Sequence, residues 1–495
     1  MDEQSKEEKS GVKDYYIKAK HRFLQGSSFV RKHSLVFTLL LVLLLQVLPN
    51  PGGTYPWGGL WIRQQSENLL FANQVATSTL DNFVRQQAGQ VVAQQYPNLP
   101  DANRQKLVDD VTKKIFTEKK GELASQHGTL AQEVRDHFQY DEGGKKYTYM
   151  PDIDPYYYLR FARNLIEKGH VYDALKNGKQ WDNHMSAPFG TGVEETWHPY
   201  VLVGIYELMS IFNPQIPLMQ GAAYYGLVLM FISTVLIFFL TRRIAGNLAG
   251  FFAALLLSLL PSILGRTPWG HADTDAYNIF FPTLAFFLII EAVFADSFKK
   301  RVLFAGLTGA SIGIYIKFWS GWWYVLDFII GALVIALVFE LVHNTRKWSN
   351  NNILDFLLRI VLLAPIAILR DLVTDTRNFV GRIKTDKHIQ KYGIIVTILL
   401  VSSGIVSVIV GGFNNFIVGL TRGAITFTAI KNASLPTLWP NVFTTVAELN
   451  ASSLGEVVNS AGGLLVFFIS MLGALLLLFK GRKEHAFEFP YDLIW

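Results

Sequence analysis

Long apolar blocks recur along this chain and are separated by shorter polar segments. Several blocks approach the roughly 20 residues that an α-helix needs to cross a bilayer. Within a block the apolar residues show no helical or strand period, which is typical of helices that are apolar on every side. The blocks are residues 34–49, 217–240, 247–263, 277–294, 302–317, 324–342, 394–410 and 464–479. The pattern predicts an all-α protein, a polytopic transmembrane helical bundle with large external loops.

The composition excludes an ordinary soluble protein. Half of the residues are hydrophobic and only 17% are charged, whereas soluble proteins carry roughly 25% charged residues. The net charge of +6 does not indicate a nucleic-acid partner, because membrane proteins concentrate their excess lysine and arginine in cytosolic loops. The chain has no cysteine, which excludes disulfides and thiolate metal sites.

The basic residues also predict the topology. Residues 1–33 form a basic cytosolic tail, and residues 34–49 form the first transmembrane helix. Residues 50–214 are then external, with a polar, glutamine-rich helical insertion at 64–137 and an apolar helix at 198–213 lying along the outer interface.

Residues 215–412 contain the following transmembrane helices, with an external loop at 265–276. Basic residues flank 354–369 on both sides, so this block is expected on the inner surface. Residues 413–462 form a second external loop. Residues 463–495 begin with a transmembrane helix and end at the start of what reads as a further helix.

Three short acidic motifs fall in segments that this topology places on one side of the membrane. They are Asp152-Ile153-Asp154-Pro155, Asp273-Thr274-Asp275 with Arg266 upstream, and Thr445-x-x-Glu448. Carboxylates from separate loops can converge on a hard divalent cation such as Mg²⁺ or Mn²⁺. The motifs therefore predict an external metal site.

Each motif also has a purely structural interpretation. Asp154 before a proline is typical of a helix N-cap, and Asp275 has the right position to cap a helix from residue 276. Thr445-x-x-Glu448 is a capping box, and Arg266 can snorkel to the interface. Asp273 is the residue that capping explains least. The three histidines expected outside are either metal ligands or solvated and packed side chains: His184, His198 and His271.

These motifs, in this order and on this side, resemble those of the catalytic subunit of archaeal oligosaccharyltransferase. The resemblance covers most of the chain from about residue 150. Asp152-x-Asp154-Pro155-Tyr156 is similar to the family's first external acidic motif, and Asp273-x-Asp275 to its second. Thr445-x-x-Glu448 is similar to the TIxE-type motif of its long external loop, with Val446 in place of isoleucine.

The resemblance implies a multi-pass glycosyltransferase of the GT-C class in the cell membrane, with its active site on the extracytoplasmic face. Such an enzyme transfers a glycan from a dolichyl-linked donor to asparagine in Asn-x-Ser/Thr, with inversion. Its partners are that donor, the acceptor polypeptide and membrane lipids, with no nucleic acid. By resemblance, Asp154, Asp273 and Asp275 hold a divalent cation, Mn²⁺ or Mg²⁺. Glu448 and Asp154 bind the acceptor carboxamide, Glu448 also touches the cation, and Arg266 meets donor phosphate or stabilises the acidic cluster.

The chain departs from the family at its C-terminal side. The family continues with more helices and a soluble domain bearing Trp-Trp-Asp-Tyr-Gly, a motif that this sequence lacks. We therefore expect an incomplete chain. Three alternatives remain: a GT-C polyprenyl-phosphate-sugar transferase with another acceptor, a non-catalytic subunit, and a transporter, which would show ionisable residues inside spans or an inverted repeat.

Overall fold

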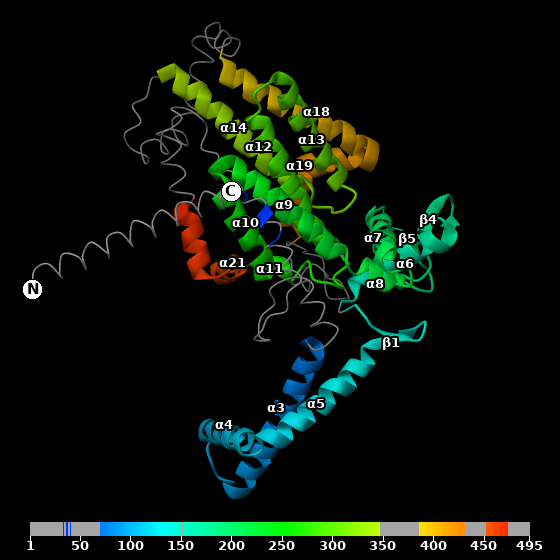
Figure 1. Cartoon of the computed structure of the whole chain (residues 1–495), viewed down its shortest axis with the longest axis vertical. Coiled ribbons are helices and arrows are strands. Elements are labelled where there is room, and N and C mark those ends of the chain that lie inside the picture. Colours follow the sequence, from blue (N-terminus) through cyan, green and yellow to red (C-terminus); the bar gives the residue numbers. More distant parts are fainter. Residues whose placement is uncertain are drawn as a thin grey trace, which may run out of the picture.

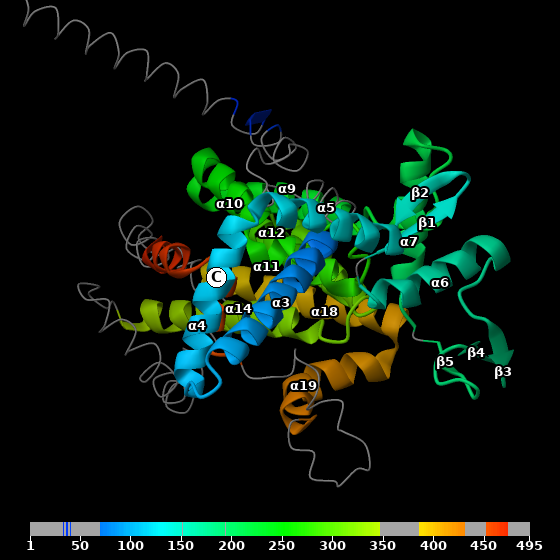
Figure 2. The same ribbon diagram turned by 90° about the horizontal axis from the view of Figure 1, so that it is seen from below.

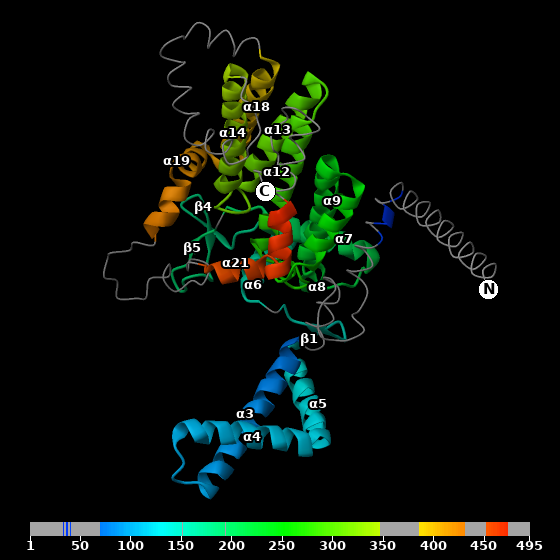
Figure 3. The ribbon, with the colours of Figure 1, turned by 90° about the vertical axis from the view of Figure 1, so that its left-hand side faces the viewer.

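The computed structural model describes residues 70–150, 152–193, 195–346, 386–430 and 452–473, with residues 33, 36, 37 and 40. Several predicted features lie outside these residues: nearly all of the first transmembrane helix, the block at 354–369, Glu448 and the end of the chain. The described part is mostly helical. It divides into a helical bundle, a region of short strands and helix α6 (Asp154–Lys168) beside it and a three-helix insertion, as Figures 1 and 3 show.

The insertion is a triangle of three helices that stands clear of the bundle (Figures 1 and 3). They are α3 (Leu70–Gln95), α4 (Asp101–Glu118) and α5 (Lys120–His137). Alanines 72, 76 and 131 pack where α3 meets α5, and Leu80, Val84 and Leu123 form a second small core. The helices predicted for residues 64–137 are thus present, with apolar residues buried only along the lines where they touch.

The region beside the bundle contains two small antiparallel sheets that the all-α prediction omitted. A hairpin of β1 (Gln139–Glu142) and β2 (Lys145–Thr148) turns at two glycines. After α6 (Asp154–Lys168), three strands pair in the order β3-β4-β5. These are β3 (Ala174–Lys176), β4 (Lys179–Asp182) and β5 (Thr191–Gly192). Strands of two to four mostly polar residues show too little alternation to be recognised in a sequence.

The bundle follows α7 (His198–Phe212), and Figure 2 shows the hairpin, α6 and β3–β5 to one side of it. Its elements up to the second acidic motif are α8 (Leu218–Ala222), α9 (Tyr225–Ala245), α10 (Asn247–Leu259), α11 (Pro261–Leu264) and the 3₁₀ turn η1 (Thr274–Ala276). The remaining helices are α12 (Tyr277–Val293), α13 (Phe298–Tyr315), α14 (Trp323–Arg346), α18 (Lys387–Gly411), α19 (Phe413–Ile430) and α21 (Leu454–Ser460).

Among the described residues, three helices are long and apolar enough to cross a membrane: Leu218–Ala245, Thr274–Val293 and Lys387–Gly411. A fourth is reached if Leu454–Ser460 and Leu464–Gly473, which meet at 83°, count as one broken span. The segments predicted at 247–263 and 324–342 are helical, but their apolar helices are shorter. The sequence therefore predicted the positions of these helices, while the described residues contain fewer candidate spans than it predicted.

Glycines allow a close contact between α13 and α18 in the bundle. Gly309 and Gly313 lie one turn apart on α13 and face α18. A Cβ atom at Gly309 would overlap the Ser402 hydroxyl and the Leu399 carbonyl oxygen, and one at Gly313 would lie 2.8 Å from Val406 Cβ. Small residues at this spacing let two helix backbones approach in membrane proteins, so the two glycines set the distance between α13 and α18.

Candidate functional site

The first acidic motif lies at the start of α6. Ile153 occupies the N-cap position, Asp154 is the first helical residue and Pro155 follows it. No side chain caps this helix, so the N-cap interpretation of Asp154 is wrong. The carboxylate of Asp154 is exposed at the helix N-terminus, where the helix dipole favours a negative charge.

The second motif belongs to a loop, residues 265–275, that is fixed on α8 and α9. Trp269 is fully buried beneath it. The backbone N–H of Gly270, whose φ is +87°, donates to the Ala223 carbonyl oxygen at 3.0 Å. Gly226 lies directly under the loop, because a Cβ there would come within 3.0 Å of the Thr267 carbonyl oxygen. The loop backbone is therefore held by packing that involves none of its acidic side chains.

Capping in this loop is the reverse of the sequence-based interpretation. Asp273, not Asp275, is the N-cap of η1, and its Oδ1 accepts from Thr274 N–H at 2.5 Å. Burial raises the pKa of Asp273, and the charges of Asp275 and Asp154 raise it further, against the Thr274 hydrogen bond and the charge of His271. Asp154 is thus near enough for its charge to act on Asp273.

The imidazole of His271 joins the two motifs directly. Its Nε2 lies 3.3 Å from Asp275 Oδ2, and its Nδ1 lies 3.8 Å from Asp152 Oδ2. Arg266 adds an ion pair from the rim, with Nη1 2.6 Å from Asp275 Oδ2. Of the five site residues predicted from the sequence, the structure brings Arg266, Asp273 and Asp275 together in one cluster with His271. Asp154, at the start of α6, acts on Asp273 through its charge, and Glu448 lies outside the described residues.

The donor atoms of this cluster fit a divalent cation. One ligand atom from each of His271, Asp273 and Asp275 lies within 4.8 Å of the others. Two carboxylates and an imidazole are a donor set that Mn²⁺ and other divalent first-row ions accept. Arg266 offsets only part of the negative charge of Asp152, Asp154, Asp273 and Asp275, so the cluster retains an attraction for cations.

His198 lies behind the loop and not in the cluster. It is fully buried, with Nε2 3.0 Å from the Ala272 carbonyl oxygen and Nδ1 3.0 Å from the Tyr277 hydroxyl. Because a carbonyl only accepts, Nε2 carries the proton and Nδ1 accepts from the tyrosine. Burial lowers the pKa of His198 to about 4, so the neutral ring supports the residue that precedes Asp273.

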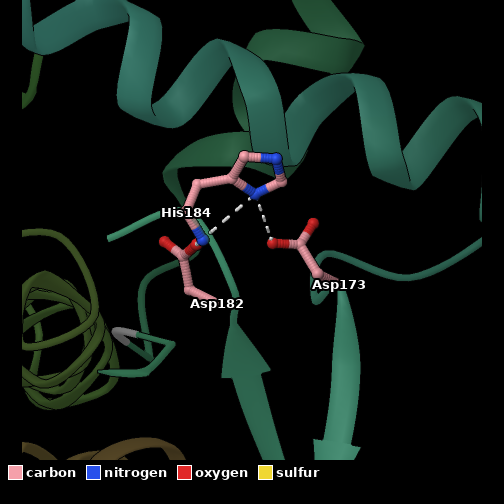
Figure 4. Close-up of side chains that lie close together, drawn as sticks. All are labelled: Asp173, Asp182 and His184. Atoms are coloured by element: carbon pink, nitrogen blue, oxygen red, sulfur yellow. Dashed lines mark hydrogen bonds and ion pairs between the residues drawn. The ribbon is translucent and has the colours of Figure 1, made fainter. Parts of the chain in front are cut away.

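Figure 4 shows a second group that could hold a metal ion, Asp173, Asp182 and His184, beside the three-stranded sheet. His184 Nδ1 lies 3.0 Å from Asp173 Oδ2 and 3.9 Å from Asp182 Oδ1. Arg160 of α6 pairs with both carboxylates, at 2.8 Å to Asp173. A guanidinium already balances these charges, so we interpret the group as an ion-pair network that attaches the sheet to α6.

The ion-pair network of Arg160, Asp173, Asp182 and His184 was not predicted from the sequence. Burial would raise the pKa of Asp173, but hydrogen bonds from Asn164, Asn183 and His184 and the charge of Arg160 bring it well below its usual range. Nothing in the spacing of these residues indicated that they meet, because short strands place them together only in the folded chain.

Three apolar helices of membrane-spanning length define an integral membrane protein. One of them begins beside a group of two carboxylates and an imidazole that could hold a metal ion. Residues 132–485 match the sequence family described as oligosaccharyl transferase STT3, N-terminal. The match covers more than half of the chain, and the chain belongs to this family.

Two archaeal relatives carry the name dolichyl-phosphooligosaccharide-protein glycotransferase. The protein of Methanococcus voltae is 28% identical over 348 residues, which are 69% of this chain and 35% of that protein. The protein of Methanocaldococcus jannaschii is 26% identical over 401 residues, which are 70% of this chain and 42% of that protein. The chain thus spans well under half the length of these relatives.

Among solved structures, the chain resembles the archaeal oligosaccharyltransferase AglB from Archaeoglobus fulgidus, determined with an inhibitory peptide and a dolichol-phosphate. The TM-score is 0.42 at 17% sequence identity, over 70% of this chain and 43% of that protein.

Proposed function

We propose that this chain carries the catalytic loops of an oligosaccharyltransferase, which moves a glycan from a dolichyl-linked donor to asparagine in Asn-x-Ser/Thr. The observation that carries the proposal is the meeting of the two acidic motifs, with His271 Nδ1 3.8 Å from Asp152 Oδ2. The names of the archaeal relatives support the same reaction.

The proposal places the site on the extracytoplasmic face of the cell membrane, in a multi-pass GT-C bundle. Residues 1–33 would be cytosolic, and residues 50–214, 265–276 and 413–462 external. In support, the structure brings residues of the first and second of these external segments together at one end of α12.

Asp154, Asp273 and Asp275 would hold the divalent cation, Mn²⁺ or Mg²⁺, with Glu448 as a further contact. The bound cation supplies positive charge that orients the donor and offsets the charge developing on its phosphate. Asp273 is fixed for this role because Thr274 N–H holds its Oδ1, while its second oxygen stays available for a ligand.

The acceptor presents a chemical difficulty, since the lone pair of an amide nitrogen is delocalised and a poor nucleophile. Carboxylates that accept hydrogen bonds from both N–H groups, here Asp154 and Glu448, would localise that lone pair. The nitrogen then bonds to the anomeric carbon as the bond from that carbon to the phosphate oxygen breaks. The lipid phosphate leaves with the electron pair, a carboxylate takes the amide proton, and attack from the opposite face inverts the anomeric centre.

The test is glycan transfer to a fluorescent Asn-x-Thr peptide in membranes that contain the complete gene product, a lipid-linked glycan and Mn²⁺. Asp154→Asn, Asp273→Asn and Glu448→Gln should each lower the rate by about 100-fold or more, the scale of losing one preorganised electrostatic contact. Glu167→Gln, an exposed change on the same helix as Asp154, should leave it unchanged.

Transfer that survives all three substitutions would overturn the assignment. Transfer to a hydroxyl acceptor while the asparagine peptide stays unmodified would instead favour another polyprenyl-phosphate-sugar transferase.

A further inference from the structure

Among the described residues of the site, His271 contacts both acidic motifs and is almost completely enclosed. Only 9% of the residue is exposed. We propose that His271 supplies a nitrogen ligand to the divalent cation, beside Asp273 and Asp275, and that Asp152 orients its ring. The inference rests on the metal-dependent transfer proposed above and extends it to the composition of the metal site.

The distances suit a shared ion. In octahedral coordination with bonds near 2.1 Å, neighbouring donor atoms lie about 3 Å apart and opposite ones about 4 Å apart. Nε2 of His271 lies 3.3 Å from Asp275 Oδ2, and one ligand atom from each of His271, Asp273 and Asp275 lies within 4.8 Å of the others. Side-chain rotations of these three residues would bring their donor atoms to coordination distance of a single ion.

The second ring nitrogen of His271, Nδ1, lies near the carboxylate of Asp152. Metal-binding histidines almost always direct their second ring nitrogen to a carboxylate, carbonyl or water, which fixes the tautomer and the orientation of the ring. Asp152 Oδ2 is 3.8 Å from His271 Nδ1, and the Asp152 side chain is 41% exposed. Its other oxygen, Oδ1, accepts from the Ile153 N–H at 2.7 Å, which leaves Oδ2 on the side of the imidazole. With the proton on Nδ1, Nε2 offers its lone pair to the cation. Asp152 would thus act as a positioning residue.

The loop explains why the ring points inward. Trp269 is buried, Gly270 takes a positive φ and His271 N–H donates to the Pro268 carbonyl oxygen at 3.1 Å. This tight turn directs the side chain of His271 toward Asp275. The orientation of the imidazole therefore follows from the backbone.

A nitrogen ligand changes which ion the site prefers. Mg²⁺ favours oxygen donors and releases its water reluctantly, whereas imidazole binds first-row transition ions. The site should therefore bind Mn²⁺ more tightly than Mg²⁺. This difference in affinity should be lost when His271 is replaced.

The experiment uses Mn²⁺ as the probe, added to the full chain in lipid nanodiscs and observed by electron spin-echo envelope modulation. Directly bound imidazole gives a ¹⁴N modulation, which we expect in the wild type. His271→Gln should abolish that modulation and weaken Mn²⁺ binding at least tenfold, with less than a threefold change for Mg²⁺. Asp152→Asn should keep the modulation and weaken Mn²⁺ binding by about tenfold, the usual effect of a lost supporting contact.

His184→Gln is the matched control, because His184 belongs to the other Asp-His cluster. It should leave the spectrum unchanged. Loss of the modulation in His184→Gln would overturn the proposal. So would Mn²⁺ bound to the wild type without ¹⁴N modulation, or a wild type that does not bind Mn²⁺. The wild-type spectrum alone shows whether a nitrogen is bound to Mn²⁺. The proposal can therefore be tested even if a variant fails to fold. Intact modulation, together with no glycan transfer by the complete gene product, would overturn the proposed function but support the ligand.

Discussion

Arg266 and Asp275 form an ion pair with 2.6 Å between Nη1 and Oδ2, at the rim of the acidic cluster. The arginine side chain is 51% exposed, whereas that of Asp275 is 23% exposed. The guanidinium and a divalent cation would therefore share one carboxylate, the first from the solvent side and the second from within.

Removing the arginine charge should strengthen cation binding. In the wild type, the negative charge of Asp275 is partly neutralised by Arg266. In Arg266→Gln that charge is no longer neutralised, so Asp275 attracts the cation more strongly. Exposed ion pairs contribute roughly 0.2–1 kcal/mol, so the Kd for Mn²⁺ should fall by a factor between about 1.4 and 5, measured by titration calorimetry. Arg266→Lys, which keeps the charge, should stay close to the wild type. Weaker binding in Arg266→Gln would mean that the arginine chiefly holds Asp275 in place.

The buried His198 should make stability depend on pH. The pKa of His198 is about 4 in the folded protein and near 6.5 when unfolded, so the unfolded state binds more protons between these values. Stability should be complete above pH 6.5 and fall by about 3 kcal/mol toward pH 4. Thermal unfolding at several pH values measures this slope.

Two variants assign the slope to this ring. His198→Gln cannot titrate and should flatten the dependence between pH 6.5 and 4, while lowering stability at pH 8. His137→Gln changes an exposed histidine of α5 and should keep the wild-type slope. An unchanged slope in His198→Gln would show that another group controls it.

Arg160→Met should release the small sheet from α6. Asp182 is completely buried and pairs with this arginine, and a buried carboxylate that loses its partner costs about 3–5 kcal/mol. Hydrogen exchange across residues 173–192 should accelerate, and the thermal midpoint should fall. Arg163→Met, an exposed change on the same helix, is the control. Adding Asp182→Asn to Arg160→Met should restore part of the loss, and no recovery would contradict this account.

Gly309→Ala should separate α13 from α18. Its methyl group would overlap Ser402 and a backbone oxygen, and overpacking of this kind costs about 1–3 kcal/mol. At Gly306, on the same helix, the nearest atom to an added Cβ is 3.8 Å away, so Gly306→Ala should be neutral or stabilising. Thermal unfolding in detergent compares the two, and equal midpoints would contradict the close contact.

The sequence predicted the helices well because apolar blocks and basic clusters are local properties of the chain. It also predicted that the first two acidic motifs converge, and Asp152 and Asp275 indeed lie on either side of His271. The sequence predicted Asp275 as the cap, but the structure has Asp273 in that position, because the 3₁₀ turn before α12 moves the cap by two residues. The Arg160 network could not be predicted, since it depends on how a loop folds back on a helix.

The support beneath residues 265–275 also affects how quickly a ligand binds. Trp269, Gly270 and the contact of Gly226 with Thr267 fix the loop without using its acidic side chains. The conformational entropy of this loop is therefore lost when the protein folds, not when a ligand arrives. Association with a cation should then be limited by loss of water from the ion, with no slow rearrangement of the backbone before it.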